Sequence, residues 1–152
     1  MTGHRVGAVI ACQTRLAEIE KFLDTVTICP SQLGQKAALW GLQNLENWLA
    51  QERHEILARR QAIIYHFPTL AAKGWRLLGL GAYFAYLEHP FDVDGTDLAQ
   101  KLVEEAGVLA LPGSMFLPEG DDCGRRHLRI AFANISAEMI VVLFDRMAQV
   151  SQ

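Results

Sequence analysis

At 152 residues, the chain is long enough for one compact domain, which would bury roughly 70% of the surface that the unfolded chain exposes. Hydrophobic residues make up 51% of the sequence and charged residues 20%, which excludes a disordered or low-complexity protein. The net charge of −3 gives no basic surface for DNA, RNA or an anionic membrane. No apolar run reaches the ~20 residues of a membrane-spanning helix, and the N-terminal segment lacks a signal-peptide pattern. We therefore expect a globular cytoplasmic protein that binds neither nucleic acid nor membrane.

The first part of the chain predicts one strand followed by helices. Apolar residues alternate over residues 6–11, which is typical of a strand. Apolar residues then recur at helical spacing over residues 16–26. Ser31 is a suitable N-cap for a second helical stretch over residues 31–67, which is either one long helix or two helices with a break near residues 50–52.

The second part of the chain predicts a small sheet with helices, so that the fold class is α/β with an α+β small domain. Two strands are expected at 75–78 and 83–87, with the tight turn between them at Gly79 and Gly81, because glycine readily adopts the φ angles of such turns. The remaining expected elements are a helix at 96–106 ended by Gly107, a buried strand at 108–111, a strand at 127–132 and a last helix capped by Ser136.

Two arginines are candidate binding residues. Arg129 lies on the polar face of a predicted strand, where its planar guanidinium could bind a carboxylate through two hydrogen bonds. An arginine on the solvated face of a half-buried sheet is the alternative interpretation. Arg5 lies between Gly3 and Gly7, where the backbone can approach a phosphate closely, and a plain surface arginine is again the alternative.

Several classes of site have no support in the sequence. The five histidines show neither paired spacing nor nearby cysteines or carboxylates at ligand spacing, so we expect no metal site. The glycine-rich motifs of nucleotide-binding proteins and the nucleophile motif of serine hydrolases are absent. The three cysteines are widely spaced and predict reduced thiols rather than a disulfide framework.

Five motifs occur in a fixed order along nearly the whole chain. They are G-x-R-x-G within residues 3–11, P-S-x-x-x-Q-x-A-A within 28–39, G-x-Y-F within 81–91, G-V-x-x-x-P-G-x-x-F within 106–116 and L-R-I-x-F-A within 127–136. Together these segments resemble the C-terminal third of a pyridoxal-phosphate-dependent aminotransferase of fold type I, from the class I/II family. The resemblance implies that residues 1–50 are a remnant of the large cofactor-binding domain with the start of a linking helix, and that residues 51–152 are the small C-terminal α/β domain.

The resemblance also implies a role for each candidate arginine. In the family, the arginine of G-x-R-x-G helps to hold the phosphate of the cofactor, and here that position is Arg5. The arginine of L-R-I-x-F-A binds the α-carboxylate of the substrate, and here that position is Arg129. The ligands implied are pyridoxal phosphate, an amino acid and a 2-oxo acid.

One departure from the family concerns the lysine that forms the Schiff base. In the family this lysine lies in a Ser-x-x-Lys pattern a few residues before G-x-R-x-G, and the lysines of this chain, at 21, 36, 73 and 101, do not occupy that pattern. Without this amino group the cofactor loses its covalent tether and its general base. We therefore expect no catalytic residue in this chain, weak or no binding of pyridoxal phosphate, and no transamination by the chain alone.

The expected function is that of the C-terminal part of an aminotransferase, and the alternative is a non-catalytic interaction or structural module derived from one. The strand at 6–11 would have unpaired edges, which favours a homodimer. A large exposed apolar patch along residues 31–50 would favour the fragment or the module over an independent enzyme.

Overall fold

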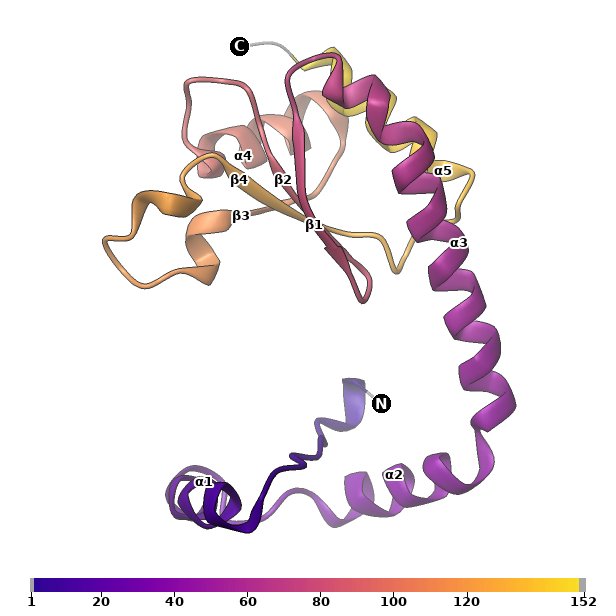
Figure 1. Cartoon of the computed structure of the whole chain (residues 1–152), viewed down its shortest axis with the longest axis vertical. Helices are drawn as coiled ribbons and strands as arrows, with labels where there is room; N and C mark the ends of the chain where they lie inside the picture. The colour runs from indigo at the N-terminus through magenta and orange to yellow at the C-terminus, as the bar shows by residue number, and fades with distance from the viewer. Residues whose placement is uncertain (1, 151–152) are drawn as a thin grey trace. The chain divides into compact units, whose positions relative to one another are not determined.

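A computed structural model describes residues 2–150 (Figure 1). The chain divides into two compact units, Met1–Gln51 (unit 1) and Glu52–Gln152 (unit 2). Within the described residues, no helix is both long and apolar enough to cross a membrane. The three cysteines are free and exposed, in agreement with the predicted thiols. In chain order, with η for a 3-10 helix, the elements are η1 Thr2–His4, α1 Gln13–Val26, α2 Gln32–Asn44, α3 Glu46–Ala71, β1 Arg76–Gly81, β2 Phe84–Glu88, α4 Gly95–Ala106, β3 Leu111–Pro112, η2 Gly113–Phe116, η3 Asp122–Gly124, β4 His127–Ala131 and α5 Met139–Gln149.

Unit 1 is helical, and its described residues form no hydrophobic core of their own. The predicted helix at 16–26 is confirmed as α1. The predicted strand at 6–11 is wrong, because this segment pairs with no strand among the described residues and is left without regular structure. In the described part of unit 1, the only buried residues are Gly34 and Gly41, both in α2. Burial of apolar side chains therefore contributes little to the stability of this unit by itself.

The predicted helical stretch at 31–67 consists of two helices. The break lies at Leu45 rather than at 50–52, and the backbone there (φ −109°, ψ 22°) leaves the helical region. The second helix, α3, also continues through Pro68 to Ala71 instead of ending before the proline. Pro68 has no N–H to donate to the preceding turn, so it removes one hydrogen bond of the helix without ending it.

Unit 2 is built on a four-stranded antiparallel sheet with strand order β1-β2-β4-β3. The predicted alternation along the strand at 127–132 is confirmed, because Leu128, Ile130 and Phe132 are buried whereas Arg129 lies half-buried on the other face. Leu87 of β2 pairs with Leu128 and is also fully buried. One face of the sheet is therefore core, and the other carries the polar and aromatic side chains.

The turn between the first two strands lies later than predicted. Gly81 pairs with Phe84, so the two-residue turn consists of Ala82 and Tyr83. Ala82 adopts a positive φ of 48°, the conformation for which glycine had been expected. Gly79 instead lies within β1, beside the irregularity in register between β1 and β2.

Helices cover the buried face of the sheet and complete the core of unit 2. Leu70 of α3, Leu102 of α4 and Ile140 of α5 are each completely buried in one cluster with the sheet residues. The helices α3 and α5 run side by side (Figure 1), with the rings of Phe67 and Phe144 edge to face at 6.0 Å. The helix predicted at 96–106 is confirmed as α4.

The ends of the predicted elements are partly confirmed. Gly107 ends α4 with a left-handed φ of 62°, as predicted. The strand expected at 108–111 is much shorter, because only Leu111 and Pro112 pair with β4, although Val108 is buried. Ser136 is not the N-cap of α5: the helix begins at Met139, and the Ser136 carbonyl accepts a hydrogen bond from the Met139 N–H in a turn before it.

His89 is a completely buried histidine directly after β2, and neither of its ring nitrogens has a hydrogen-bond partner among the described residues. Its ring lies stacked 6.0 Å from Phe91 and edge to face 6.2 Å from Trp75. Burial among these rings, helped by the charge of Arg126, lowers the pKa of His89 to about 4, against the opposing charges of Asp94 and Glu88. The folded protein therefore holds His89 in its neutral form.

We predict that acid destabilises unit 2 through His89. The unfolded chain takes up a proton as the pH falls below the ordinary pKa of 6.5, whereas the folded chain does so only near pH 4. Stability is therefore lost between pH 6.5 and pH 4, by about 3 kcal/mol. Urea denaturation at several pH values should show that His89→Gln removes this part of the pH dependence.

The exposed His54 provides the control for this experiment. We expect His54→Gln to retain the pH dependence of the wild-type protein. An equal pH dependence in His89→Gln and the wild type would show that His89 does not cause the acid loss.

Candidate functional site

Arg129 lies on the open face of the sheet, held by the strand that carries it. It pairs with Tyr86 of β2 on one side and with Leu111 of β3 on the other. The neighbours of Arg129 along β4, Leu128 and Ile130, are anchored in the core on the opposite face. The backbone of Arg129 is therefore fixed, and its side chain projects from the half-buried face as the sequence predicts.

Two aromatic rings stack against the guanidinium of Arg129. The Cζ atom lies 4.3 Å from the ring centroid of Phe84 and 4.2 Å from that of Phe116. Both distances lie well within the ~6 Å range of cation–π interactions. Phe84 comes from β2, and Phe116 comes from the short helix η2 that follows β3. Residues from three separate segments thus converge on one cation.

The hydrogen-bonding groups of Arg129 are not used within the described part of the protein. Its Nε is buried without a partner, and none of the ion pairs formed by residues 2–150 includes Arg129. A buried N–H without a partner costs about 1–3 kcal/mol. The two Nη atoms form no hydrogen bond with the described residues, and neither belongs to the buried side-chain atoms that lack a partner. This edge of the guanidinium suits the two oxygens of a carboxylate.

Gly113 allows η2 to approach the sheet closely. A Cβ atom at this position would lie 2.6 Å from the Gly124 carbonyl oxygen and 2.7 Å from the hydroxyl of Tyr86. The Tyr86 ring contacts His127 edge to face at 5.2 Å, and burial raises the pKa of Tyr86. The absence of a side chain at Gly113 thus lets η2 pack against β2 and β4, which brings Phe116 to Arg129.

Arg5 lies in unit 1, immediately after η1, and its side chain is exposed. Its φ of 50° is uncommon for a residue with a side chain. The neighbouring backbone packs on α2, because a Cβ on Gly34 would lie 3.1 Å from the His4 carbonyl oxygen and 3.3 Å from Val6 Cβ. Arg5 therefore lies beside the first turn of α2, whose free N–H groups and positive dipole end favour anions.

The two predicted arginines belong to different units, and the structure describes each in its own surroundings. Arg129 lies in unit 2 with aromatic residues, whereas Arg5 lies in unit 1 beside α2. The sequence did not assign a role to Phe84, Phe116 or Gly113, although all three stand in the quoted motifs. Because side chains alternate between the two faces of a strand, the alternation along β2 and β4 could have placed Phe84 on the same face as Arg129. The approach of η2 to the sheet depends on tertiary packing, which no local pattern encodes.

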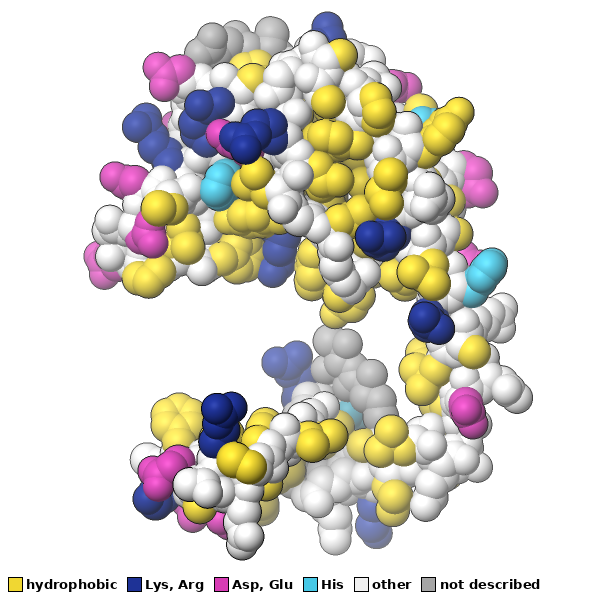
Figure 2. Space-filling model, in the orientation of Figure 1, with side chains coloured by type: hydrophobic (Ala, Val, Ile, Leu, Met, Phe, Trp, Pro, Cys, Tyr) yellow, Lys and Arg dark blue, Asp and Glu magenta, His cyan; other side chains and the backbone are white. Residues whose placement is uncertain are grey.

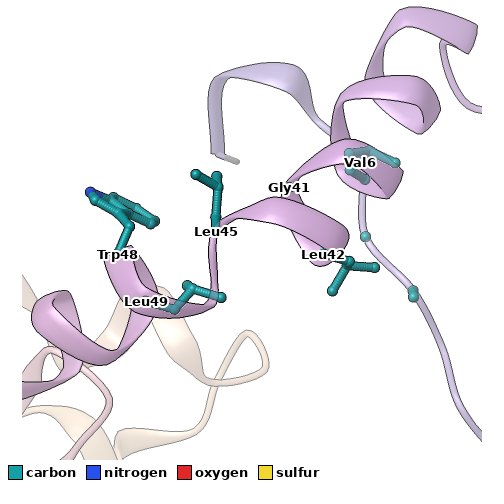
Figure 3. Close-up of a pocket in the computed structure, with 9 residues that line it drawn as sticks. Val6, Gly41, Leu42, Leu45, Trp48 and Leu49 are labelled. Atoms are coloured by element: carbon teal, nitrogen blue, oxygen red, sulfur yellow. The ribbon is translucent and has the colours of Figure 1, made fainter.

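Unit 1 exposes many apolar side chains, and Figure 2 shows several apolar patches on the face in view. Leu33 and Leu42 of α2 are 78% and 80% exposed, and Trp48 of α3 is 51% exposed. A groove of about 300 Å³ runs between the segment at 6–8 and the junction of α2 with α3, where Figure 3 shows Leu45, Trp48 and Leu49. The exposed apolar patch considered for residues 31–50 is thus present in the structure.

Comparisons with known proteins agree on one family. The profile described as aminotransferase class I and II matches residues 1–147. An aspartate aminotransferase of Sulfurisphaera tokodaii is 27% identical over 142 residues, which cover 88% of this chain and 33% of the relative. An aspartate aminotransferase of Thermotoga maritima is 28% identical over 148 residues, which cover 96% and 35%. The solved structure of an archaeal alanine:glyoxylate aminotransferase has a TM-score of 0.78 at 23% identity, over 97% of this chain and 37% of that chain. The chain thus spans about a third of the length of the curated relatives it matches.

We predict that Gly113→Ala destabilises unit 2 by about 1–3 kcal/mol, because the added methyl group overlaps backbone as well as side-chain atoms. Urea denaturation monitored by circular dichroism would measure the change. Gly81→Ala is the matched control, since a Cβ there meets nothing within 4 Å, and its stability should stay within about 0.5 kcal/mol of the wild type. Equal stabilities of the two variants would show that η2 has room to shift.

Proposed function

We propose that this chain, which belongs to the aminotransferase class I and II family, forms the C-terminal part of an enzyme that transfers an amino group between an amino acid and a 2-oxo acid. The family and the mixed fold expected from the sequence are confirmed by the comparisons. We assign residues 1–50 to a remnant of the large cofactor-binding domain and residues 51–152 to the small domain. A cytoplasmic location and a homodimer belong to the same proposal.

The observation that carries this proposal is that the guanidinium of Arg129 forms no hydrogen bond or ion pair with the described residues. It lies on a rigid strand, stacks on two rings and offers two Nη atoms that no described residue occupies. An arginine that is only part of the solvated face of a sheet would hydrogen-bond its Nε to water, whereas the Nε of Arg129 is buried without a partner. This arrangement favours carboxylate binding over the plain solvated-face interpretation.

A carboxylate-binding arginine suits both substrates of an aminotransferase. Amino-group transfer exchanges an amino group for an oxo group at the α-carbon and leaves the adjacent carboxylate unchanged. One guanidinium at a fixed position can therefore bind the amino acid and the 2-oxo acid in the same orientation. Binding through two parallel hydrogen bonds also fixes the direction in which the α-carbon points.

Pyridoxal phosphate supplies the electron sink for such a reaction when it is bound. Arg5 is the residue of this chain that we assign to its phosphate group, supported by the exposed side chain and by the adjacent first turn of α2. None of the four lysines stands in the Ser-x-x-Lys pattern that precedes G-x-R-x-G in the family. The residues present thus fit the phosphate group and do not fit the covalent attachment of the cofactor.

We predict that the purified 152-residue chain shows no turnover of amino acids with 2-oxoglutarate when pyridoxal phosphate is added. The reason is the absence of the tethering and proton-transferring lysine. A coupled assay that detects glutamate would measure the reaction. Addition of pyridoxal phosphate should also leave Arg5→Ala and the wild type spectroscopically alike, since only nonspecific imines form with surface lysines.

Measurable turnover by the wild-type chain would refute the assignment of this chain as catalytically incomplete. Lys21→Arg, Lys36→Arg, Lys73→Arg and Lys101→Arg variants would then identify the lysine that attaches the cofactor.

A non-catalytic interaction module is the second candidate function, and the exposed apolar surface of unit 1 favours it. Large apolar side chains project from α2 and the start of α3 without any buried counterpart within this unit. Such surfaces on soluble proteins mark sites of association. Apolar burial by a partner would supply the stabilisation that unit 1 does not generate by itself.

We predict that the isolated chain self-associates through this surface. Leu42→Glu, which places a charge on the apolar groove, should shift the protein toward monomer in size-exclusion chromatography with light scattering. Gln43→Glu, an exposed neighbour on the same helix, should leave the association unchanged. A monodisperse wild-type monomer at high concentration would contradict the prediction.

A further inference from the structure

We infer that Phe84 and Phe116 are positioning residues for Arg129, holding the guanidinium so that a carboxylate meets it only end-on, through the two Nη atoms. This inference deepens the proposed function and rests on it, because it specifies how the assigned carboxylate site recognises its ligand. It assigns roles to two residues for which the sequence suggested none.

Phe84, Phe116 and Arg129 lie close together on the open face of the sheet. Phe84 pairs with Ala131, which places it diagonally across from Arg129 on the same face of the sheet. A diagonal pair of this kind is within reach of an aromatic side chain. Phe116 approaches from η2, on the β3 side of β4. With ring centroids at 4.3 Å and 4.2 Å from Cζ, both rings are close enough to restrict the tilt of the guanidinium.

The Nε of Arg129 is held away from solvent. A free arginine side chain on an open sheet face would rotate to hydrate its Nε, because leaving the N–H unpaired is unfavourable. Here the Nε is both buried and unpaired. The attraction between the cation and the two rings opposes this rotation and keeps the side chain in place.

The burial of Nε limits how a carboxylate can approach Arg129. A carboxylate can approach an arginine side-on, through Nε and one Nη, or end-on, through both Nη atoms. Solvent cannot reach Nε in this structure, so the side-on approach is blocked. The end-on approach remains, and it fixes the ligand in the plane of the guanidinium.

The two rings differ in their surroundings. Phe84 is half-buried within β2, whereas Phe116 is 43% exposed at the end of a 3-10 helix. Phe116 can therefore be replaced with little loss of core packing, and it is the better position for a test. Phe84→Leu removes packing as well as the ring and is the secondary variant.

The proposed experiment measures the side chain of Arg129 directly in the full 152-residue chain. Nuclear magnetic resonance of the ¹⁵N-labelled arginine side chains reports how fast the Nη groups exchange by rotation about the Nε–Cζ bond. We expect slow rotation in the wild type and in Phe116→Tyr, which keeps the ring, and faster rotation in Phe116→Leu. Met115→Leu, at an exposed neighbour in η2, should behave as the wild type does.

The second readout is the affinity for 2-oxoglutarate and for pyruvate, measured by titration with the same resonances. Loss of one ring should raise the dissociation constant about three- to tenfold, in line with a typical cation–π contribution. Phe116→Tyr, which keeps the ring, should retain the wild-type affinity. The perturbed resonances should be those of the two Nη groups, with Nε the least affected.

The outcomes distinguish the positioning role from the proposed function. If Arg129→Ala binds these acids as tightly as the wild type, or if the wild type does not bind them at all, then carboxylate recognition by this chain is refuted. The rotation rates still test the two rings in that case. If Arg129→Ala abolishes binding while Phe116→Leu changes neither the rotation rate nor the affinity, the positioning role is overturned and the proposed function stands.

Discussion

The antiparallel pairing of β2 with β4 is the interaction on which the rest of unit 2 depends. It places Leu87 opposite Leu128 on the buried face and Tyr86 opposite Arg129 on the open face. Full burial of a leucine contributes about 1.5–3 kcal/mol, so the pairing is stabilised from the side opposite the arginine. A slip of one residue would bury the guanidinium and expose the leucines, which makes this register the favoured one by a wide margin.

The same register decides what could be predicted from the sequence. The alternation in β4 is local and strong, so the strand and the direction of Arg129 follow from the residue pattern alone. The turn at Ala82 and Tyr83 could not be derived in this way, because the register of the strands determines its position and Ala82 accepts a positive φ that its residue type disfavours. The approach of Phe116 likewise depends on the space at Gly113, which is a property of packing.

The failure of the strand prediction at 6–11 has a different cause. Alternating apolar residues describe a surface that suits a sheet, but a strand exists only when another strand accepts its hydrogen bonds. None of the described strands pairs with this segment, which lies instead along the groove formed with α2 and the start of α3. The apolar residues at 6–11 therefore favour burial and strand pairing, and the described residues provide neither. The leucines of α2 are likewise apolar but exposed.

The two units thus differ in how firmly each fixes the position of its candidate arginine. Unit 2 holds Arg129 with a complete core on one side of the sheet and aromatic rings on the other, so this arrangement needs nothing from outside the unit. Arg5 has a positive φ in a unit whose apolar side chains remain exposed, and a strained backbone of that kind persists only where its surroundings enforce it. In the assembly that we propose, carboxylate recognition is therefore preorganised within this chain. Phosphate recognition by Arg5, in contrast, depends on a partner that covers the apolar surface of unit 1. The same association would therefore stabilise unit 1 and hold Arg5 in place for the cofactor.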